Sequence, residues 1–168
     1  MITGTAAVGK TTAIQSISDR PPVTTDQAAT DGLAIVKDTT TVAFDFGEIV
    51  LPDETIVRVY GTPGQERFRH MWEIIAEGAL GFIILVDASR DEPVVDLDMY
   101  LANFQKNIAE SSAVVGVTRS EQNPNVMNEI YQYLENQQLI YPVMAVDPRE
   151  KTDMKQLLLS LIAMLECY

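Results

Sequence analysis

The stretch Gly4-Thr5-Ala6-Ala7-Val8-Gly9-Lys10-Thr11 lies near the start of the chain and matches the pattern G-x-x-x-x-G-K-[ST]. Its glycines allow a loop whose successive backbone N–H groups point inward around a phosphate. In this pattern Lys10 reaches the β- and γ-phosphates, and the Thr11 hydroxyl ligates Mg²⁺. The residues that follow, 12–17, are expected to form a helix whose N-terminal dipole favours the same anion. We therefore predict a nucleotide-phosphate site formed by Ala7, Val8, Gly9, Lys10, Thr11 and Thr12.

Downstream of this loop, apolar runs of strand length alternate with helical patterns. Strands are expected at 41–51, 55–60, 81–86, 113–117 and 143–146. Apolar residues recur with helical spacing over 97–108 and 154–165, and the segment 19–40 has no period and is expected to be a long loop. Such alternation favours an α/β fold, a three-layer sandwich around a mostly parallel six-stranded sheet with one antiparallel edge strand. Because only three residues precede the phosphate loop, the first strand is expected to be short or truncated.

Composition limits the classes of protein to which the chain could belong. Its 168 residues suit one nucleotide-binding domain spanning 1–168, with 46% hydrophobic and 21% charged residues. A net charge of −12 opposes binding to nucleic acid or to an anionic membrane surface. With one cysteine, no secretory or lipidation motif and no long apolar run, we expect a cytoplasmic protein without a membrane anchor.

Two further stretches carry a family resemblance. Thr62-Pro63-Gly64-Gln65-Glu66-Arg67-Phe68-Arg69 is followed by the apolar strand pattern within 78–89, and together with the phosphate loop they resemble the Ras-like small GTPases. The resemblance implies that the Gly64 N–H contacts the γ-phosphate and that Gln65 orients the attacking water. It also implies that Thr41, with Thr40 as the rival, contacts Mg²⁺ and the γ-phosphate. Lys10, Thr41 and Gln65 are thus the expected catalytic residues, and Thr11 and Thr41 the expected metal ligands.

The chain departs from the family pattern at three places. Gly61 stands where the third motif normally has an aspartate, a loss shared with the bacterial MglA-like branch, which this chain resembles. Thr118-Arg119-Ser120-Glu121 replaces the base-recognition motif Asn-Lys-x-Asp. Thr118, Arg119 and Glu121 are assigned to the base by position, with Glu121 accepting from guanine and the Arg119 stem covering the ring. Ala145 occupies the place of the last motif, where a backbone N–H reads the guanine carbonyl.

The resemblance implies a molecular switch that binds GTP or GDP with Mg²⁺ and hydrolyses GTP slowly, with a regulatory or effector partner of the Roadblock/LC7 type. Two other classes stay open. A nucleotide-binding module without significant hydrolysis would fit Gly61, and an ATP-binding P-loop protein, an ATPase or a kinase, would fit the altered base motif. A kinase would need an arginine-rich lid, which the 12 scattered Lys and Arg residues do not supply.

Overall fold

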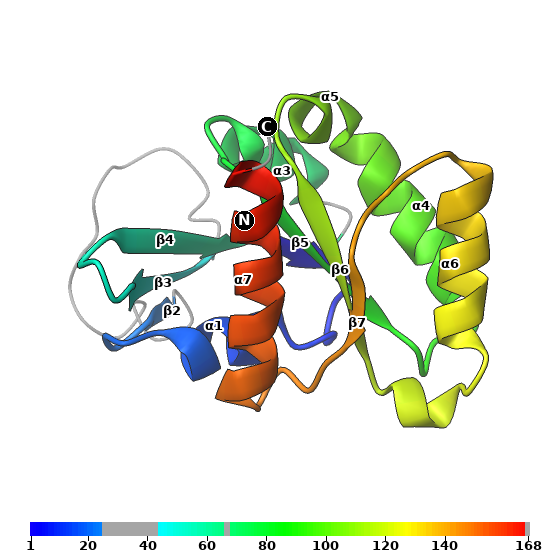
Figure 1. The fold of residues 1–168 in the computed structure, drawn as a ribbon, viewed down its shortest axis with the longest axis horizontal. Helices are drawn as coiled ribbons and strands as arrows, with labels where there is room; N and C mark the ends of the chain where they lie inside the picture. Colours follow the sequence, from blue (N-terminus) through cyan, green and yellow to red (C-terminus); the bar gives the residue numbers. More distant parts are fainter. Residues whose placement is uncertain (25–43, 66–67, 167–168) are drawn as a thin grey trace.

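A seven-stranded sheet forms the centre of the molecule (Figure 1). The computed structural model describes residues 1–24, 44–65 and 68–166. Within them the strands lie side by side in the order β2-β3-β4-β1-β5-β6-β7. Their bounds are β1 (Ile2–Gly4), β2 (Val23–Thr24), β3 (Asp45–Val50), β4 (Ile56–Gly61), β5 (Phe82–Asp87), β6 (Ala113–Thr118) and β7 (Val143–Ala145).

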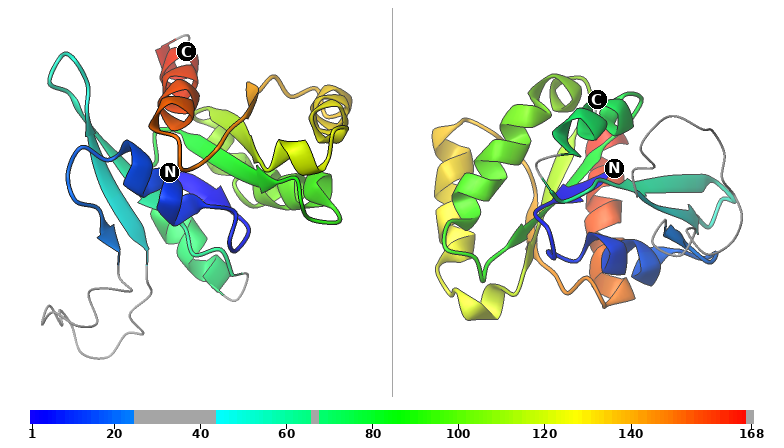
Figure 2. Two further views of the ribbon diagram at one scale, coloured as in Figure 1. Left: turned by 90° about the horizontal axis from the view of Figure 1, so that it is seen from below. Right: turned by 180° about the vertical axis from the view of Figure 1, so that it is seen from behind.

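Helices cover both faces of the sheet (Figure 2). The helices α1 (Lys10–Ile17) and α7 (Lys151–Glu166) pack on one face. The opposite face is covered by α3 (Arg69–Ala76), α4 (Pro93–Asn103), α5 (Gln105–Ala109) and α6 (Val126–Asn136). A short 3₁₀ helix, η2 (Ser120–Gln122), follows β6. None of the helices in these described ranges is long and apolar enough to cross a bilayer.

The central strands explain why the sheet needs two layers of helix. Every residue of β5 and of β6 is buried. Since successive side chains of a strand point to opposite faces, Phe82 and Ile84 enter the core under α3 and α4, whereas Ile83 and Leu85 enter the core under α1 and α7. A strand that is apolar on both faces is stable only where both faces are covered, as expected for buried parallel strands.

The predicted α/β fold is confirmed, including the mostly parallel sheet, the single antiparallel strand and the short first strand. β1 has three residues and pairs in parallel with β4 and with β5. β3 is antiparallel to both of its neighbours, β4 and β2. The prediction of six strands with the antiparallel strand at the edge is corrected in one respect: β2 is a seventh strand and forms the edge, so β3 lies one place in from it. β2 falls within the segment 19–40 and was not predicted, because two residues are too few to show a period.

The topology brings the loops of the phosphate motif and of the altered motifs to one edge. The parallel strands β1, β4, β5, β6 and β7 end at this edge, where ligands of open α/β sheets bind. Because β3 runs the other way, it begins at the same edge, so its first residue, Asp45, pairs with Gly61, the last residue of β4. The predicted metal ligand Thr41 and its rival Thr40 lie outside the described residues.

Candidate nucleotide-binding site

The phosphate loop leaves β1 through a conformation that requires glycine. Gly4 has a φ of 144°, and a Cβ there would lie 2.3 Å from the carbonyl oxygen of Leu85 on the adjacent strand. Only a residue without a side chain fits this close approach. The chain then turns again at Ala7, whose φ of 62° is in the left-handed region. The two turns fold residues 4–9 into a compact loop above the end of β1.

Lys10 opens helix α1 and its side chain folds back over this loop. Its ammonium donates hydrogen bonds to the carbonyl oxygens of Gly4, at 2.8 Å, and of Thr5, at 2.7 Å. The residue is 8% exposed. Burial lowers the pKa of Lys10 to about 8, although the negative charge of Asp45 acts to raise it. A buried ammonium whose charge is this poorly compensated would be stabilised by a phosphate placed in the loop.

The first turn of α1 is also open to an anion. Gly9 precedes the helix with no side-chain capping hydrogen bond, and the first turn contains no acidic residue. The first backbone N–H groups of a helix have no partner within it and carry the positive end of the dipole. Helix α1 therefore presents uncapped donors beside the Lys10 ammonium, as an anion site requires.

A cavity of about 530 Å³, here named the phosphate-end cavity, lies above this loop. It is lined on one side by Ala6, Ala7, Gly9, Lys10, Thr11 and Thr12, and on the other by Asp45, Gly61, Thr62, Pro63, Gly64, Gln65 and Phe68. The phosphate loop thus faces the predicted third motif across one space.

The third-motif loop is tied to the core at its start, through Thr62 and Pro63. The hydroxyls of Thr62 and Thr3 are hydrogen-bonded at 2.9 Å. The indole Nε1 of Trp72, which is 1% exposed, donates to the carbonyl oxygen of Pro63 at 2.7 Å. Gly64 is held so near the phosphate loop that a Cβ there would lie 2.5 Å from the Lys10 Nζ. The Gly64 backbone is therefore close to the group expected to hold the terminal phosphates.

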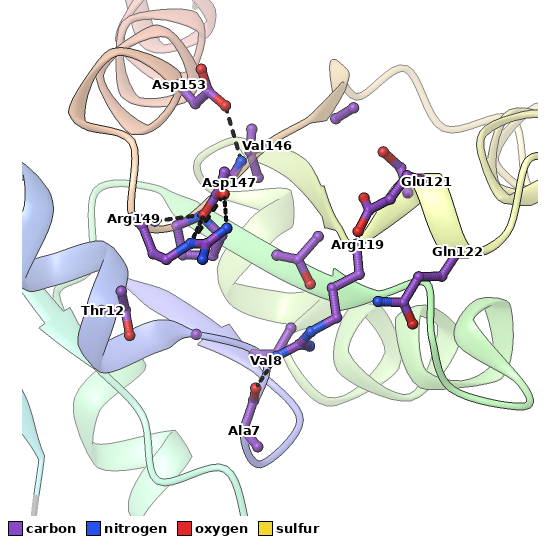
Figure 3. Close-up of a pocket in the computed structure, with 15 residues that line it drawn as sticks. Ala7, Val8, Thr12, Arg119, Glu121, Gln122, Val146, Asp147, Arg149 and Asp153 are labelled. Carbon is purple, nitrogen blue, oxygen red and sulfur yellow. Dashed lines mark hydrogen bonds and ion pairs between the residues drawn. The ribbon is translucent and has the colours of Figure 1, made fainter.

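A second cavity has a volume of about 570 Å³ and is here named the base-end cavity (Figure 3). Ala7, Gly9 and Thr12 line both cavities, and the two cavities together are here named the trough. The base-end cavity is closed by the loops that follow β6 and β7, which contribute residues 118–122 and 145–149. An anion site at one end and a second cavity of similar size beyond it give the layout that a nucleotide needs.

The Arg119 side chain extends across the base-end cavity and links the loop after β6 to the phosphate loop at Ala7 (Figure 3). Its guanidinium pairs with Asp87 at 2.5 Å and donates to the carbonyl oxygen of Ala7 at 3.1 Å. Asp87, at the end of β5, also accepts hydrogen bonds from the backbone and hydroxyl of Ser89, at 3.0 and 2.6 Å. Burial acts to raise the pKa of Asp87, but the bonds from Ser89 and Arg119 outweigh it, so the pKa lies below its usual value.

A second ion pair stands at the rim of the same cavity. Arg149 donates to Asp147 from its side chain, at 2.6 Å for Nη2, and from its backbone N–H, at 2.9 Å. These bonds lower the pKa of Asp147 to about 2. The backbone N–H of Asp147 is in turn bound by the Asp153 carboxylate at 2.9 Å. Across the cavity, Glu121 is exposed, and no hydrogen bond or ion pair within the described ranges holds its carboxylate.

The structure brings together the predicted site residues that it describes. Lys10, Thr11, Gly64 and Gln65 line the phosphate-end cavity, and Val8, Thr118, Arg119, Glu121 and Ala145 line the base-end cavity, while Ala7, Gly9 and Thr12 line both. Their roles stay predictions, and Thr41 lies outside the described residues. Sequence reasoning missed Asp45, Asp87 and Asp147. The absence of an aspartate at position 61 could have prompted a search for another carboxylate, such as Asp45. Asp87 could have been noticed because it follows an apolar strand at the edge of the sheet where the motifs meet.

The oxygen atoms at the phosphate end suit a small hard cation. The Thr11 hydroxyl lies 2.5 Å from an oxygen of Asp45, and hydroxyl and carboxylate oxygens are ligands that Mg²⁺ prefers. No group of three or more His, Cys, Asp or Glu side chains able to hold a metal occurs in the described part of the chain. These residues therefore fit a cation that shares its coordination with phosphate oxygens and water, which is how Mg²⁺ binds with nucleotides.

The fold, the phosphate loop and the trough define a P-loop nucleotide-binding protein. Comparison with known families agrees: residues 20–103, half of the chain, match the family described as "Conserved hypothetical ATP binding protein". The chain belongs to this family. The matched region contains β3, β4, α3, β5 and α4, and so includes the third motif and Asp45.

The chain is also similar to the uncharacterized protein MJ1339 of Methanocaldococcus jannaschii. The two are 31% identical over 102 residues, a match that covers 58% of each chain. The similarity thus spans less than two thirds of the length of this relative.

Proposed function

We propose that this chain binds ATP with Mg²⁺ in the trough and hydrolyses it slowly, changing the contacts of its loops with the state of the γ-phosphate. The observation that carries the proposal is the buried Lys10 ammonium, held over the phosphate loop beside the uncapped first turn of α1. The carbonyl oxygens of Gly4 and Thr5 carry only partial negative charge, so they compensate the ammonium incompletely. A triphosphate supplies the charge that it lacks.

ATP is the first expected ligand because the family is described as ATP-binding. The altered base motif is compatible with this choice. The Arg119 guanidinium is committed to Asp87 and Ala7, so its flat side chain can cover a purine ring without reading its edge. Glu121 can accept one hydrogen bond from the exocyclic amine of adenine.

GTP is a second candidate, and the position of Glu121 favours it. A carboxylate at the cavity can accept from both the N1–H and the exocyclic amine of guanine, which offers two donors where adenine offers one. The Ras-like pattern of residues 62–69 supports the same switch reading. In that case Thr41 and Gly64 would hold the two loops against the γ-phosphate, as the resemblance implies.

Hydrolysis is expected to be slow. Gln65 is exposed at the phosphate-end cavity, where it can align a water molecule. Lys10 is the only cation in the described lining of that cavity, and no arginine joins it there. Arginine fingers accelerate phosphoryl transfer by about 10³- to 10⁵-fold, and one could be supplied by a partner protein. A regulator of the Roadblock/LC7 type remains the proposed partner.

A thermal-melt panel tests the proposal, with ATP, ADP, GTP and GDP, each with and without Mg²⁺. A ligand that binds only the folded state stabilises it by about 2.7 kcal/mol at one hundred times its dissociation constant. We expect ATP with Mg²⁺ to raise the melting temperature. In a separate assay of phosphate release, we expect the wild type to release more phosphate from ATP than the Lys10→Ala control does. A shift with guanine nucleotides alone would replace ATP with GTP, and binding without phosphate release would leave a nucleotide-binding module. No shift with any nucleotide would refute the proposal.

A further inference from the structure

Gly61 is crowded by two side chains at the place where the third motif normally carries an aspartate. It is buried, and a Cβ added there would lie 2.8 Å from Cδ1 of Ile14 and 3.2 Å from Cβ of Asp45. The first distance is shorter than real Cβ atoms show, and the second is tighter than most. The space into which an aspartate at position 61 would extend is thus already occupied by side chains, one of which carries a carboxylate.

That carboxylate comes from the neighbouring strand. Asp45 is the first residue of β3 and is paired with Gly61 across the antiparallel ladder. Side chains of directly paired residues lie on the same face of a sheet and close together. The Asp45 Oδ2 lies 3.5 Å from the place of a Gly61 Cβ and accepts a hydrogen bond from the Thr11 hydroxyl at 2.5 Å.

The charge of Asp45 is unusual for a site that receives phosphates. Within the described lining of the phosphate-end cavity it is the only acidic residue, facing the single cation Lys10. A bare carboxylate beside a triphosphate is repulsive, and in a partly buried site this repulsion is screened less than in water. The arrangement becomes favourable when a divalent cation lies between the carboxylate and the phosphates.

We propose that Asp45 is the carboxylate of the Mg²⁺ site, acting with Thr11 and supplied from β3 in place of the missing aspartate at position 61. This inference rests on the proposed function, because it concerns the cation that accompanies the bound nucleotide. This arrangement differs from the Ras-like pattern in one respect. The metal site keeps a carboxylate, but the carboxylate comes from β3 and not from position 61. The glycine at 61 is consistent with the arrangement, since it leaves space beside Asp45.

The test is the affinity for a fluorescent, non-hydrolysable ATP analogue, measured with Mg²⁺ and with EDTA. Asp45→Asn removes the charge and keeps the shape. Glu48→Gln removes one charge from the same strand, at a residue that faces Arg20 and Arg58 and does not line the cavity. Asp45→Glu keeps the charge. A melt of each variant without nucleotide shows whether it is folded.

We expect Mg²⁺ to tighten binding by the wild type and by Glu48→Gln, and Asp45→Asn to lose about 10- to 100-fold of this enhancement. In EDTA the Asn variant should bind at least as tightly as the wild type, because the repulsion is gone. Asp45→Glu should retain more of the enhancement than Asn does.

Three results would overturn the inference. An undiminished Mg²⁺ enhancement in Asp45→Asn would place the carboxylate elsewhere and leave the proposed function intact. Equal losses in Asp45→Asn and Glu48→Gln would show that the effect follows total charge. Failure of the wild type to bind the analogue in either condition would remove the proposed function, and the inference with it.

Discussion

The phosphate-end cavity is built around a glycine-containing loop with Lys10 and Thr11, whereas two ion pairs stand in the lining of the base-end cavity. Gly4 and Gly9 give the first region its shape. Arg119 with Asp87, and Arg149 with Asp147, give the second region its shape. Backbone sites tolerate little variation and are recognisable as motifs. Side-chain sites can change identity while the cavity persists, so under the proposed function we expect the phosphate end to set the class of ligand and the base end to set which base is bound.

The largest expected effect comes from Lys10→Ala, which removes the only cation in the described lining of the phosphate-end cavity. We expect nucleotide binding to weaken by about 3 kcal/mol, roughly a hundredfold or more, for every nucleotide that binds. Nucleotide-dependent thermal melts measure this loss. Lys106→Ala, an exposed lysine on α5, is the control and should bind as the wild type does. Unchanged nucleotide binding by Lys10→Ala would show that the phosphates do not bind at the phosphate-end cavity.

A smaller loss is expected from Asp87→Asn, which breaks the ion pair with Arg119 at the base end. Because the pKa of Asp87 is lowered in the fold, its carboxylate stabilises the protein above its unfolded pKa near 3.9, and this contribution is lost as the pH falls through the folded pKa. Urea unfolding should show a deficit of about 1–2 kcal/mol at neutral pH that shrinks as the pH falls below about 3.9.

The control for this variant is Asp91→Asn, an exposed carboxylate after β5. It should show no comparable deficit. A deficit of Asp87→Asn that stays constant with pH would mean that packing, and not the charge of the carboxylate, stabilises the base end.

Glu121→Gln tests whether the two ends of the trough act separately, because it should change the preference for the base and leave the phosphate end intact. Replacing the carboxylate with an amide exchanges one acceptor for a donor. We expect the ratio of GTP to ATP affinity to fall by about tenfold, close to 1.4 kcal/mol. Parallel titrations with both nucleotides measure it, and Glu129→Gln on α6 is the exposed control. Equal weakening of both nucleotides would show that Glu121 acts on the trough as a whole.

The smallest effect is expected from Arg149→Ala. The Arg149–Asp147 pair is exposed, with 79% of the Arg149 side chain accessible, and exposed pairs contribute little. The pKa of Asp147 should rise from about 2 toward its usual value once the guanidinium is gone, which an NMR titration can follow. The melting temperature without nucleotide should stay close to that of the wild type. A clear drop would mean that the rim pair supports the β7 loop.

Much of the fold could be predicted because its signals are local. The apolar runs within 82–87 and 113–118 are buried on both faces, and each strand had been expected within a residue or two of its observed bounds. The two-residue β2 could not be anticipated, since it is defined only by pairing with Phe46 and Asp45 on β3. A pairing between distant residues leaves no pattern in either segment.

The same distinction applies to the site. The phosphate loop is contiguous in sequence, and its geometry follows from its own glycines. Asp45 gains its meaning only from the register that places it beside Gly61 and Thr11, which are 16 and 34 residues away along the chain. Arg119 could be assigned to the base by position, but its bonds to Asp87 and Ala7 depend on how β5, β6 and the phosphate loop converge.

The most direct test of the central claim is calorimetric titration of the wild type and of Lys10→Ala with a non-hydrolysable ATP analogue and Mg²⁺. We expect saturable binding at one site per chain in the wild type and binding weaker by roughly a hundredfold or more in Lys10→Ala. Equal binding by both proteins would place the nucleotide away from the phosphate loop. No binding by either protein, to this analogue or to the corresponding GTP analogue, would contradict the claim that the trough is a nucleotide site.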